Sequence, residues 1–115
     1  MSITRYESSA VYSKVTEANG IVFTAGVIPT DLARDVTGQT SEVLAEIDRL
    51  LALAGTDKSK VVQATVWLND IRHRDGMNAA WSAWLGGKDA PARACVEAKL
   101  IDPRMLVEIS VVAVK

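Results

Sequence analysis

The spacing of apolar positions along the chain alternates between strand-like and helix-like patterns. Short apolar-rich runs at residues 11–15 and 21–27 predict two strands. The dipeptide Asn19-Gly20 between them favours a type I′ hairpin turn, because both central residues of that turn need a positive φ. The chain is therefore expected to open on an antiparallel hairpin.

Two amphipathic helices are expected further along the chain. After a loop at residues 29–38, apolar residues recur every three or four positions from 43 to 54, with charged residues between them. We expect hydroxyls at Thr40-Ser41 to cap this helix and Gly55 to end it. A second helix is expected over residues 75–85, ending at Gly86-Gly87. One face of that helix carries Met77, Ala80, Trp81 and Trp84.

Three more strands are expected, at residues 61–68, 92–99 and 105–114. A further strand before the first helix is left open. This order predicts a single α+β domain over residues 1–115, with one sheet and two helices on one of its faces. The other face would then be buried against neighbouring subunits.

Composition supports an oligomer and excludes several partners. Of the 115 residues 49% are hydrophobic and 23% are charged, more apolar surface than a small domain hides easily. The net charge of −1 gives no electrostatic basis for binding nucleic acid or an anionic membrane. The single cysteine excludes an internal disulfide framework, and no Cys/His cluster has metal-ligand spacing. With neither a signal segment nor a transmembrane run, a cytoplasmic protein is expected.

Two charged residues stand on apolar strands, Arg93 and Glu108. An unpaired charge in such a setting costs several kcal/mol, so each must find a partner or a ligand. Arg93 is either a structural cation, tied to Glu108 or to a neighbour's carboxylate, or a bidentate clamp for a substrate carboxylate. Glu108 is either an interface counter-ion or a base that polarises water.

Several short runs of the chain together form a recognisable pattern. They are Pro91-Ala92-Arg93-Ala94-Cys95-Val96, Val107-Glu108-Ile109, Ile21-Val22-Phe23-Thr24-Ala25-Gly26-Val27-Ile28-Pro29, Met77-Asn78-Ala79-Ala80-Trp81 and residues 60–70. These runs resemble the Rid family, also called YjgF/YER057c/UK114, and look closest to its YoaB-like branch. The likeness covers almost the whole chain and keeps the spacing between Tyr12, Gly26, Arg93 and Glu108.

The resemblance implies a chorismate-mutase-like (YjgF-like) fold and a homotrimer with ligand clefts between subunits. It also implies a cofactor-independent hydrolase of C=N bonds, a 2-iminoalkanoate/enamine deaminase that converts reactive imino acids to 2-keto acids and ammonia. In that scheme Arg93 and Glu108 are catalytic, Arg93 also binds the substrate carboxylate, and Tyr12, Cys95 and Gly26 line the cleft. No metal is required, because imines hydrolyse in water unaided.

Other interpretations remain open for these residues and for the function. Cys95 is expected to be a pocket-lining thiol on the Arg93 side of its strand and not a nucleophile, because the only histidine, His73, lies in a charged, exposed segment. Trp67, Trp81 and Trp84 are expected to pack in the core or an interface. Ala25 and the pair Ala10-Val11 depart from the family pattern at the cleft rim. The alternative function is a non-catalytic trimeric binder or sensor of small carboxylates or keto acids.

Overall fold

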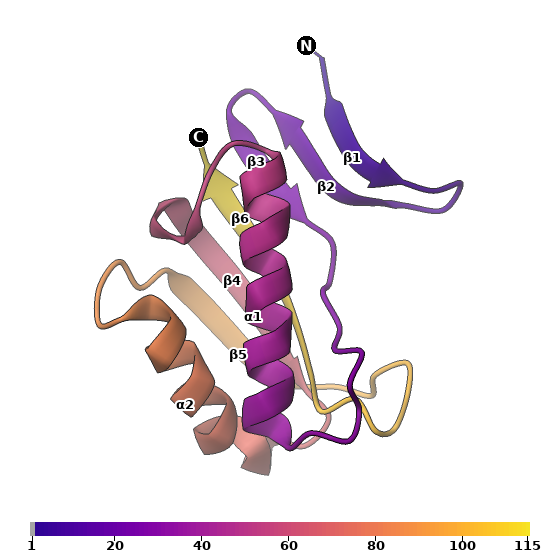
Figure 1. Cartoon of the computed structure of the whole chain (residues 1–115), viewed down its shortest axis with the longest axis vertical. Coiled ribbons are helices and arrows are strands. Elements are labelled where there is room, and N and C mark those ends of the chain that lie inside the picture. Colours follow the sequence, from indigo (N-terminus) through magenta and orange to yellow (C-terminus); the bar gives the residue numbers. More distant parts are fainter. Residues whose placement is uncertain (1) are drawn as a thin grey trace.

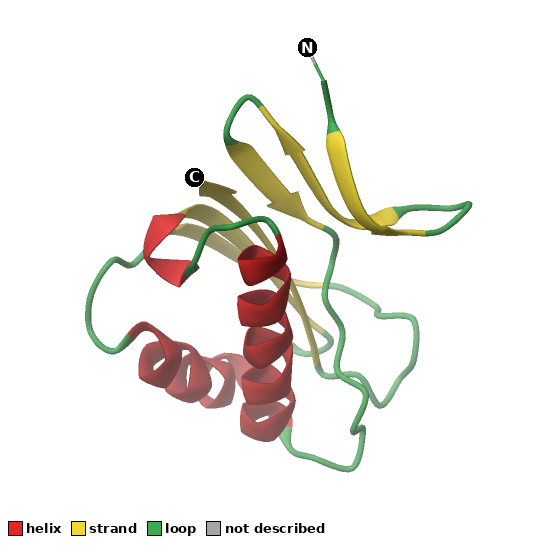
Figure 2. Ribbon diagram, turned by 45° about the horizontal axis from the view of Figure 1, so that its top comes forward, coloured by secondary structure: helices red, strands yellow, loops and turns green. Residues whose placement is uncertain are grey.

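The computed structural model describes residues 2–115 as one six-stranded sheet with two helices on one face (Figures 1 and 2). The strand order is β1-β2-β3-β6-β4-β5, with β4 and β5 parallel and the other neighbours antiparallel. The edges of the sheet are therefore β1 and β5. The bounds are β1 Thr4–Ser8, β2 Ser13–Ala18, β3 Ile21–Thr24, α1 Val36–Leu53, β4 Val61–Leu68, α2 Arg74–Leu85, β5 Ala92–Glu97 and β6 Val107–Val114.

At the N-terminus the predicted turn at Asn19-Gly20 is confirmed, but the strands around it differ from the predicted ones. Asn19 and Gly20 have φ values of 53° and 75°, which confirms the two-residue turn of type I′ character between β2 and β3. The strand left open between the hairpin and the first helix does not form, because residues 25–35 contain only an isolated bridge between Val27 and Ile109. The additional strand is β1, at the N-terminus, which was not predicted and pairs with β2. It is largely exposed and shows no apolar alternation, so it carried no strand signal. The strand β2 begins two residues and ends three residues later than predicted, and β3 begins as predicted but ends three residues earlier.

The predicted start of α1 at Thr40-Ser41 was wrong. The helix begins at Val36, because the Asp35 carboxylate accepts a hydrogen bond of 2.8 Å from the Gly38 N–H and so caps the first turn. Thr40 instead lies inside the helix and donates its hydroxyl to the Val36 carbonyl at 2.7 Å. The ends at Gly55 and at Gly86 are as predicted, with φ values of 79° and 67°.

The core lies between the helices and the sheet. On β6 every second residue is buried, from Val107 to Ala113, and these side chains meet the apolar stripe of α1. Intervening residues such as Glu108 point to the other face. That face also exposes apolar side chains, namely Ile21, Phe23, Val96 and Val114. The expectation of helices on one face is thus confirmed, and an apolar, uncovered face lies opposite.

One buried amide joins α1 to the loop that precedes β6. The Gln39 side chain is fully buried and accepts a 2.8 Å hydrogen bond from the Leu106 N–H. Its Nε2 donates to the carbonyls of Arg34 and Arg104, at 3.2 and 3.0 Å. All three side-chain hydrogen bonds go to backbone groups, so Gln39 fixes where the chain enters the strand that carries Glu108.

We expect Gln39→Leu to lower the free energy of unfolding by about 1–3 kcal/mol or more, because it leaves buried backbone groups without partners. Urea denaturation at a fixed protein concentration measures the effect. Thr40→Val is the control, since it is equally buried but loses a single hydrogen bond, worth about 1 kcal/mol. Equal losses in the two variants would contradict the role assigned to Gln39.

Candidate functional site

Arg93 lies on the edge strand β5 and reaches towards α2. It is in register with Ala64 of β4, which is fully buried beneath the helices, so Arg93 projects from the same face. Its Nη1 donates to Asn78 Oδ1 at 2.8 Å and lies 3.7 Å from Met77 Sδ. The guanidinium carbon is 5.1 Å from the centroid of the Trp81 ring. Arg93 is half-buried, and its partners within residues 2–115 are uncharged.

Cys95 lies two residues after Arg93, in register with Val66, and projects from the same face. It is half-buried and packs against the hydrophobic core. These contacts agree with the expected semi-buried thiol. Of the tryptophans expected to pack, Trp81 is buried in the core and Trp84 packs against it.

Glu108 projects from the opposite face, in register with Trp67. Its carboxylate lies against Gly26, where an added Cβ would be 2.0 Å from Oε2. Two backbone hydrogen bonds between Val27 and Ile109, of 2.8 and 3.1 Å, hold this segment beside β6. Only glycine permits so close an approach. Burial raises the pKa of the Glu108 carboxyl above its ordinary value.

The structure thus divides the expected site residues into two groups. Arg93 and Cys95 lie on the helix face of the sheet, and Glu108 lies with Gly26 on the other side. Arg93 and Glu108 do not pair with each other within the chain, and no ion pair to Arg93 occurs in residues 2–115. A single copy therefore does not assemble all the expected residues around one ligand.

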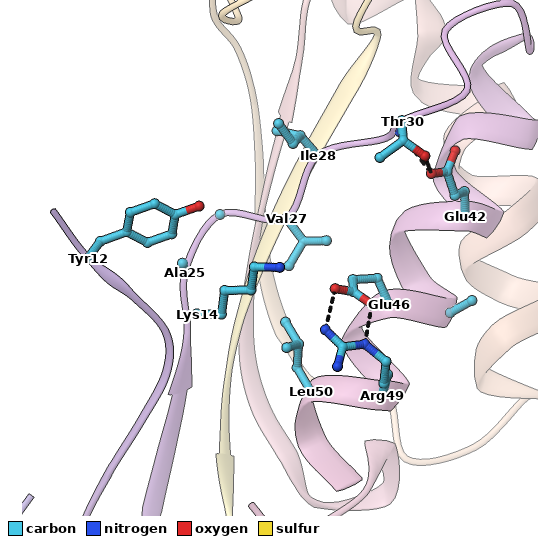
Figure 3. A pocket seen from close by; sticks show the side chains of 12 residues that line it. Tyr12, Lys14, Ala25, Val27, Ile28, Thr30, Glu42, Glu46, Arg49 and Leu50 are labelled. Carbon is cyan, nitrogen blue, oxygen red and sulfur yellow. Dashed lines mark hydrogen bonds and ion pairs between the residues drawn. The ribbon is translucent and has the colours of Figure 1, made fainter. Parts of the chain in front are cut away.

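Tyr12 and Gly26 line a pocket of about 560 Å³ between α1, the end of β3 and the segment that follows it (Figure 3). Tyr12 is exposed at its rim. Arg49 binds Glu46 with Nε at 2.6 Å and Glu7 with Nη1 at 2.7 Å, and these arginine contacts lower the pKa of Glu7 to about 2. These charges satisfy one another, so the pocket offers a ligand few free polar groups.

Sequence reasoning missed Asn78 as a partner of Arg93. The sequence pattern puts Met77 and Trp81 on a packing face of the second helix. Asn78 directly follows Met77 and lies three residues before Trp81, on the same side of that helix. That spacing was the available signal.

Within residues 2–115 no group of three or more His, Cys, Asp or Glu side chains could hold a metal ion. In the same range no helix has the length and apolar character needed to cross a membrane.

Comparison with known proteins shows which family this α+β chain belongs to. The model of the family described as Endoribonuclease L-PSP, the YjgF/Rid family, matches residues 2–115, and the chain belongs to that family. It is 43% identical over 111 residues to a RutC family protein of Haemophilus ducreyi, covering 96% of this chain and 95% of that one. It is 39% identical over 113 residues to the RutC family protein YoaB of Escherichia coli, covering 98% of each chain.

Solved structures show the same fold. The YjgF-family protein NMB1025 of Neisseria meningitidis superposes with a TM-score of 0.96 at 42% identity, covering all of this chain and 96% of that one. A structure described as a putative translation initiation inhibitor from Salmonella typhimurium gives a TM-score of 0.89 at 36% identity, covering 99% and 98%. The family resemblance expected from the sequence is therefore confirmed, as is the α+β fold.

Glu108→Gln should raise the free energy of unfolding at neutral pH. The raised pKa means that the fold disfavours the ionised carboxylate, so this group weakens stability as pH rises from about 4.5 through the folded pKa. Below about pH 4.5 both proteins carry a neutral group there, and the difference should vanish. Denaturation curves between pH 4 and 7.5 measure it. Glu17→Gln, which removes a partner of Lys115 at 3.2 Å, should give no such gain; a gain in both variants would contradict the assignment.

Proposed function

We propose that this chain is a cytoplasmic, homotrimeric 2-iminoalkanoate/enamine deaminase that hydrolyses reactive imino acids to 2-keto acids and ammonia. The observation that carries the proposal is the state of Arg93, a half-buried guanidinium at a sheet edge whose partners in residues 2–115 are all uncharged. A cation left without a counter-ion in such a place favours an anionic ligand. A 2-imino acid supplies a carboxylate next to its C=N bond.

The proposed reaction needs one base that can exchange protons with water. Glu108 accepts a proton from a water molecule as the water oxygen attacks the imine carbon, which gives a tetrahedral carbinolamine. Glu108 passes this proton to the nitrogen, then accepts the proton of the carbinolamine hydroxyl and delivers it to the same nitrogen. The C–N bond breaks with its electron pair going to that nitrogen, so neutral ammonia leaves as the carbonyl forms and Glu108 returns to the carboxylate. A pKa raised by burial suits this role, because the carboxylate becomes a stronger base.

The proposed site is shared between copies of the chain. Arg93 and Glu108 project from opposite faces of one sheet, so two copies must meet for one ligand to reach both. The free edge of β5 and the exposed apolar side chains of Ile21, Phe23 and Val114 support contact between copies through this sheet. Cys95, Tyr12 and Gly26 would line the shared cleft.

We expect Arg93→Lys to lower kcat/KM about 10- to 150-fold, because lysine keeps the charge but loses the bidentate fork, a loss of about 1.5–3 kcal/mol. The assay generates 2-iminobutanoate in situ and compares release of the keto acid with and without the protein. Arg72→Lys is the control, since Arg72 is 87% exposed and pairs with Asp70. A lysine variant as active as the parent would remove the carboxylate clamp from the proposal.

A second substitution separates catalysis from binding. Glu108→Gln keeps the size of the side chain but removes its proton acceptor, so kcat should fall about 10²- to 10⁴-fold while the Kd for 2-oxobutanoate changes little. Glu17→Gln is again the control, and sedimentation verifies that assembly is unchanged. The alternative, a non-catalytic sensor of keto acids, predicts no turnover in the parent and an effect on Kd alone.

A further inference from the structure

The guanidinium of Arg93 rests in a cradle formed by one face of α2. Trp81 lies four residues after Met77 and three after Asn78, and all three side chains meet Arg93 on the neighbouring strand. Asn78 Oδ1 accepts the Nη1 hydrogen bond at 2.8 Å, and the Trp81 ring lies beneath the guanidinium carbon at 5.1 Å. The cradle therefore constrains both the direction and the tilt of the guanidinium.

The cradle is itself held in place by α1. Met77 is fully buried and Trp81 is only 6% exposed. Gly76 approaches α1 so closely that an added Cβ would lie 2.6 Å from Val36 Cγ1, and Thr37 Oγ1 donates to the Gly76 carbonyl at 2.8 Å. Asn78 thus stands on a turn of α2 that cannot shift without disturbing the packing between the helices.

The partners in the cradle are neutral, which matters for what Arg93 can still bind. An aspartate in place of Asn78 would hold Nη1 equally well but would also compensate the positive charge. The asparagine oxygen orients the guanidinium and leaves its charge available. Of the two edges through which an arginine grips a carboxylate, the one formed by Nε and Nη2 makes no hydrogen bond within residues 2–115.

We propose that Asn78 is a positioning residue that fixes Arg93 through Nη1, so that the Nε–Nη2 edge receives the carboxylate of the ligand. This inference rests on the proposed function and specifies its binding step: the ligand is a 2-imino or 2-oxo acid gripped at one edge of the guanidinium. Asn78 acts through Arg93 and does not touch the ligand. Its loss therefore changes affinity for the carboxylate more than it changes the chemical step.

The test compares Asn78→Ala and Asn78→Asp with the parent, and Ser82→Ala, an exposed position on the same helix, is the matched control. Calorimetry measures the Kd for 2-oxobutanoate, and the coupled assay measures KM and kcat. Asn78→Ala should raise Kd and KM about 3- to 10-fold with kcat nearly unchanged, the loss of about one orienting hydrogen bond. Asn78→Asp should raise Kd at least as much while keeping the melting temperature of the parent, because it retains the contact but cancels the charge.

The outcomes separate this inference from the proposed function. If the parent binds 2-oxobutanoate without turning over imines, catalysis fails and the changes in Kd still decide the role of Asn78. If the parent is active and neither Asn78 variant alters Kd or KM, the positioning role is overturned and the deaminase stands. An aspartate variant that binds as tightly as the parent would overturn the requirement for a neutral partner. A parent that shows no affinity for 2-oxobutanoate overturns both.

Discussion

Each residue of a β-strand projects to one face of its sheet, and on β6 this rule leaves a single acceptable register. Val107, Ile109, Val111 and Ala113 are buried against the helices, so Glu108 must project to the opposite side. A slip of one residue would place its carboxylate in the core, at a cost of several kcal/mol. The pairing of β5 with β4 sets Arg93 on the helix face by the same rule. The separation of the two charges is therefore built into the packing of the core.

The partners of Arg93 distinguish it from other arginines of the chain. Arg49, Arg72 and Arg104 each bind a carboxylate on the surface, at 2.7 Å or less for the first two. Such exposed pairs contribute little to stability, about 0–1 kcal/mol each. Arg93 instead contacts the amide of Asn78, the thioether of Met77 and the indole of Trp81. No carboxylate compensates its positive charge within residues 2–115, in contrast to Arg49, Arg72 and Arg104. This contrast is a physical reason to look for a ligand at β5.

The sequence was most informative where a charged residue interrupts the apolar pattern of a predicted strand. Arg93 and Glu108 were identified because each is a charge on an apolar strand, and the face of Cys95 followed from alternation. The strand β1 was missed because its exposed residues show no alternation, and the start of α1 was misplaced because Asp35 caps it five residues before Thr40. The opposite orientation of the two charges depends on the register between strands distant in sequence, which local patterns do not specify. The contact between Arg93 and Asn78 depends on the same long-range packing.

In the proposed shared site, assembly would act on Glu108 through two opposing effects. Within one chain its carboxylate is already partly removed from water, and an apolar neighbour would raise its pKa further. The Arg93 of another copy would lower that pKa as it approached, because an opposite charge favours the ionised form. A ligand carboxylate that binds Arg93 would offset part of this second effect and leave Glu108 a stronger base while the substrate is bound. Because the cradle leaves Arg93 uncompensated, occupancy by the ligand would govern the basicity of Glu108 in the neighbouring copy.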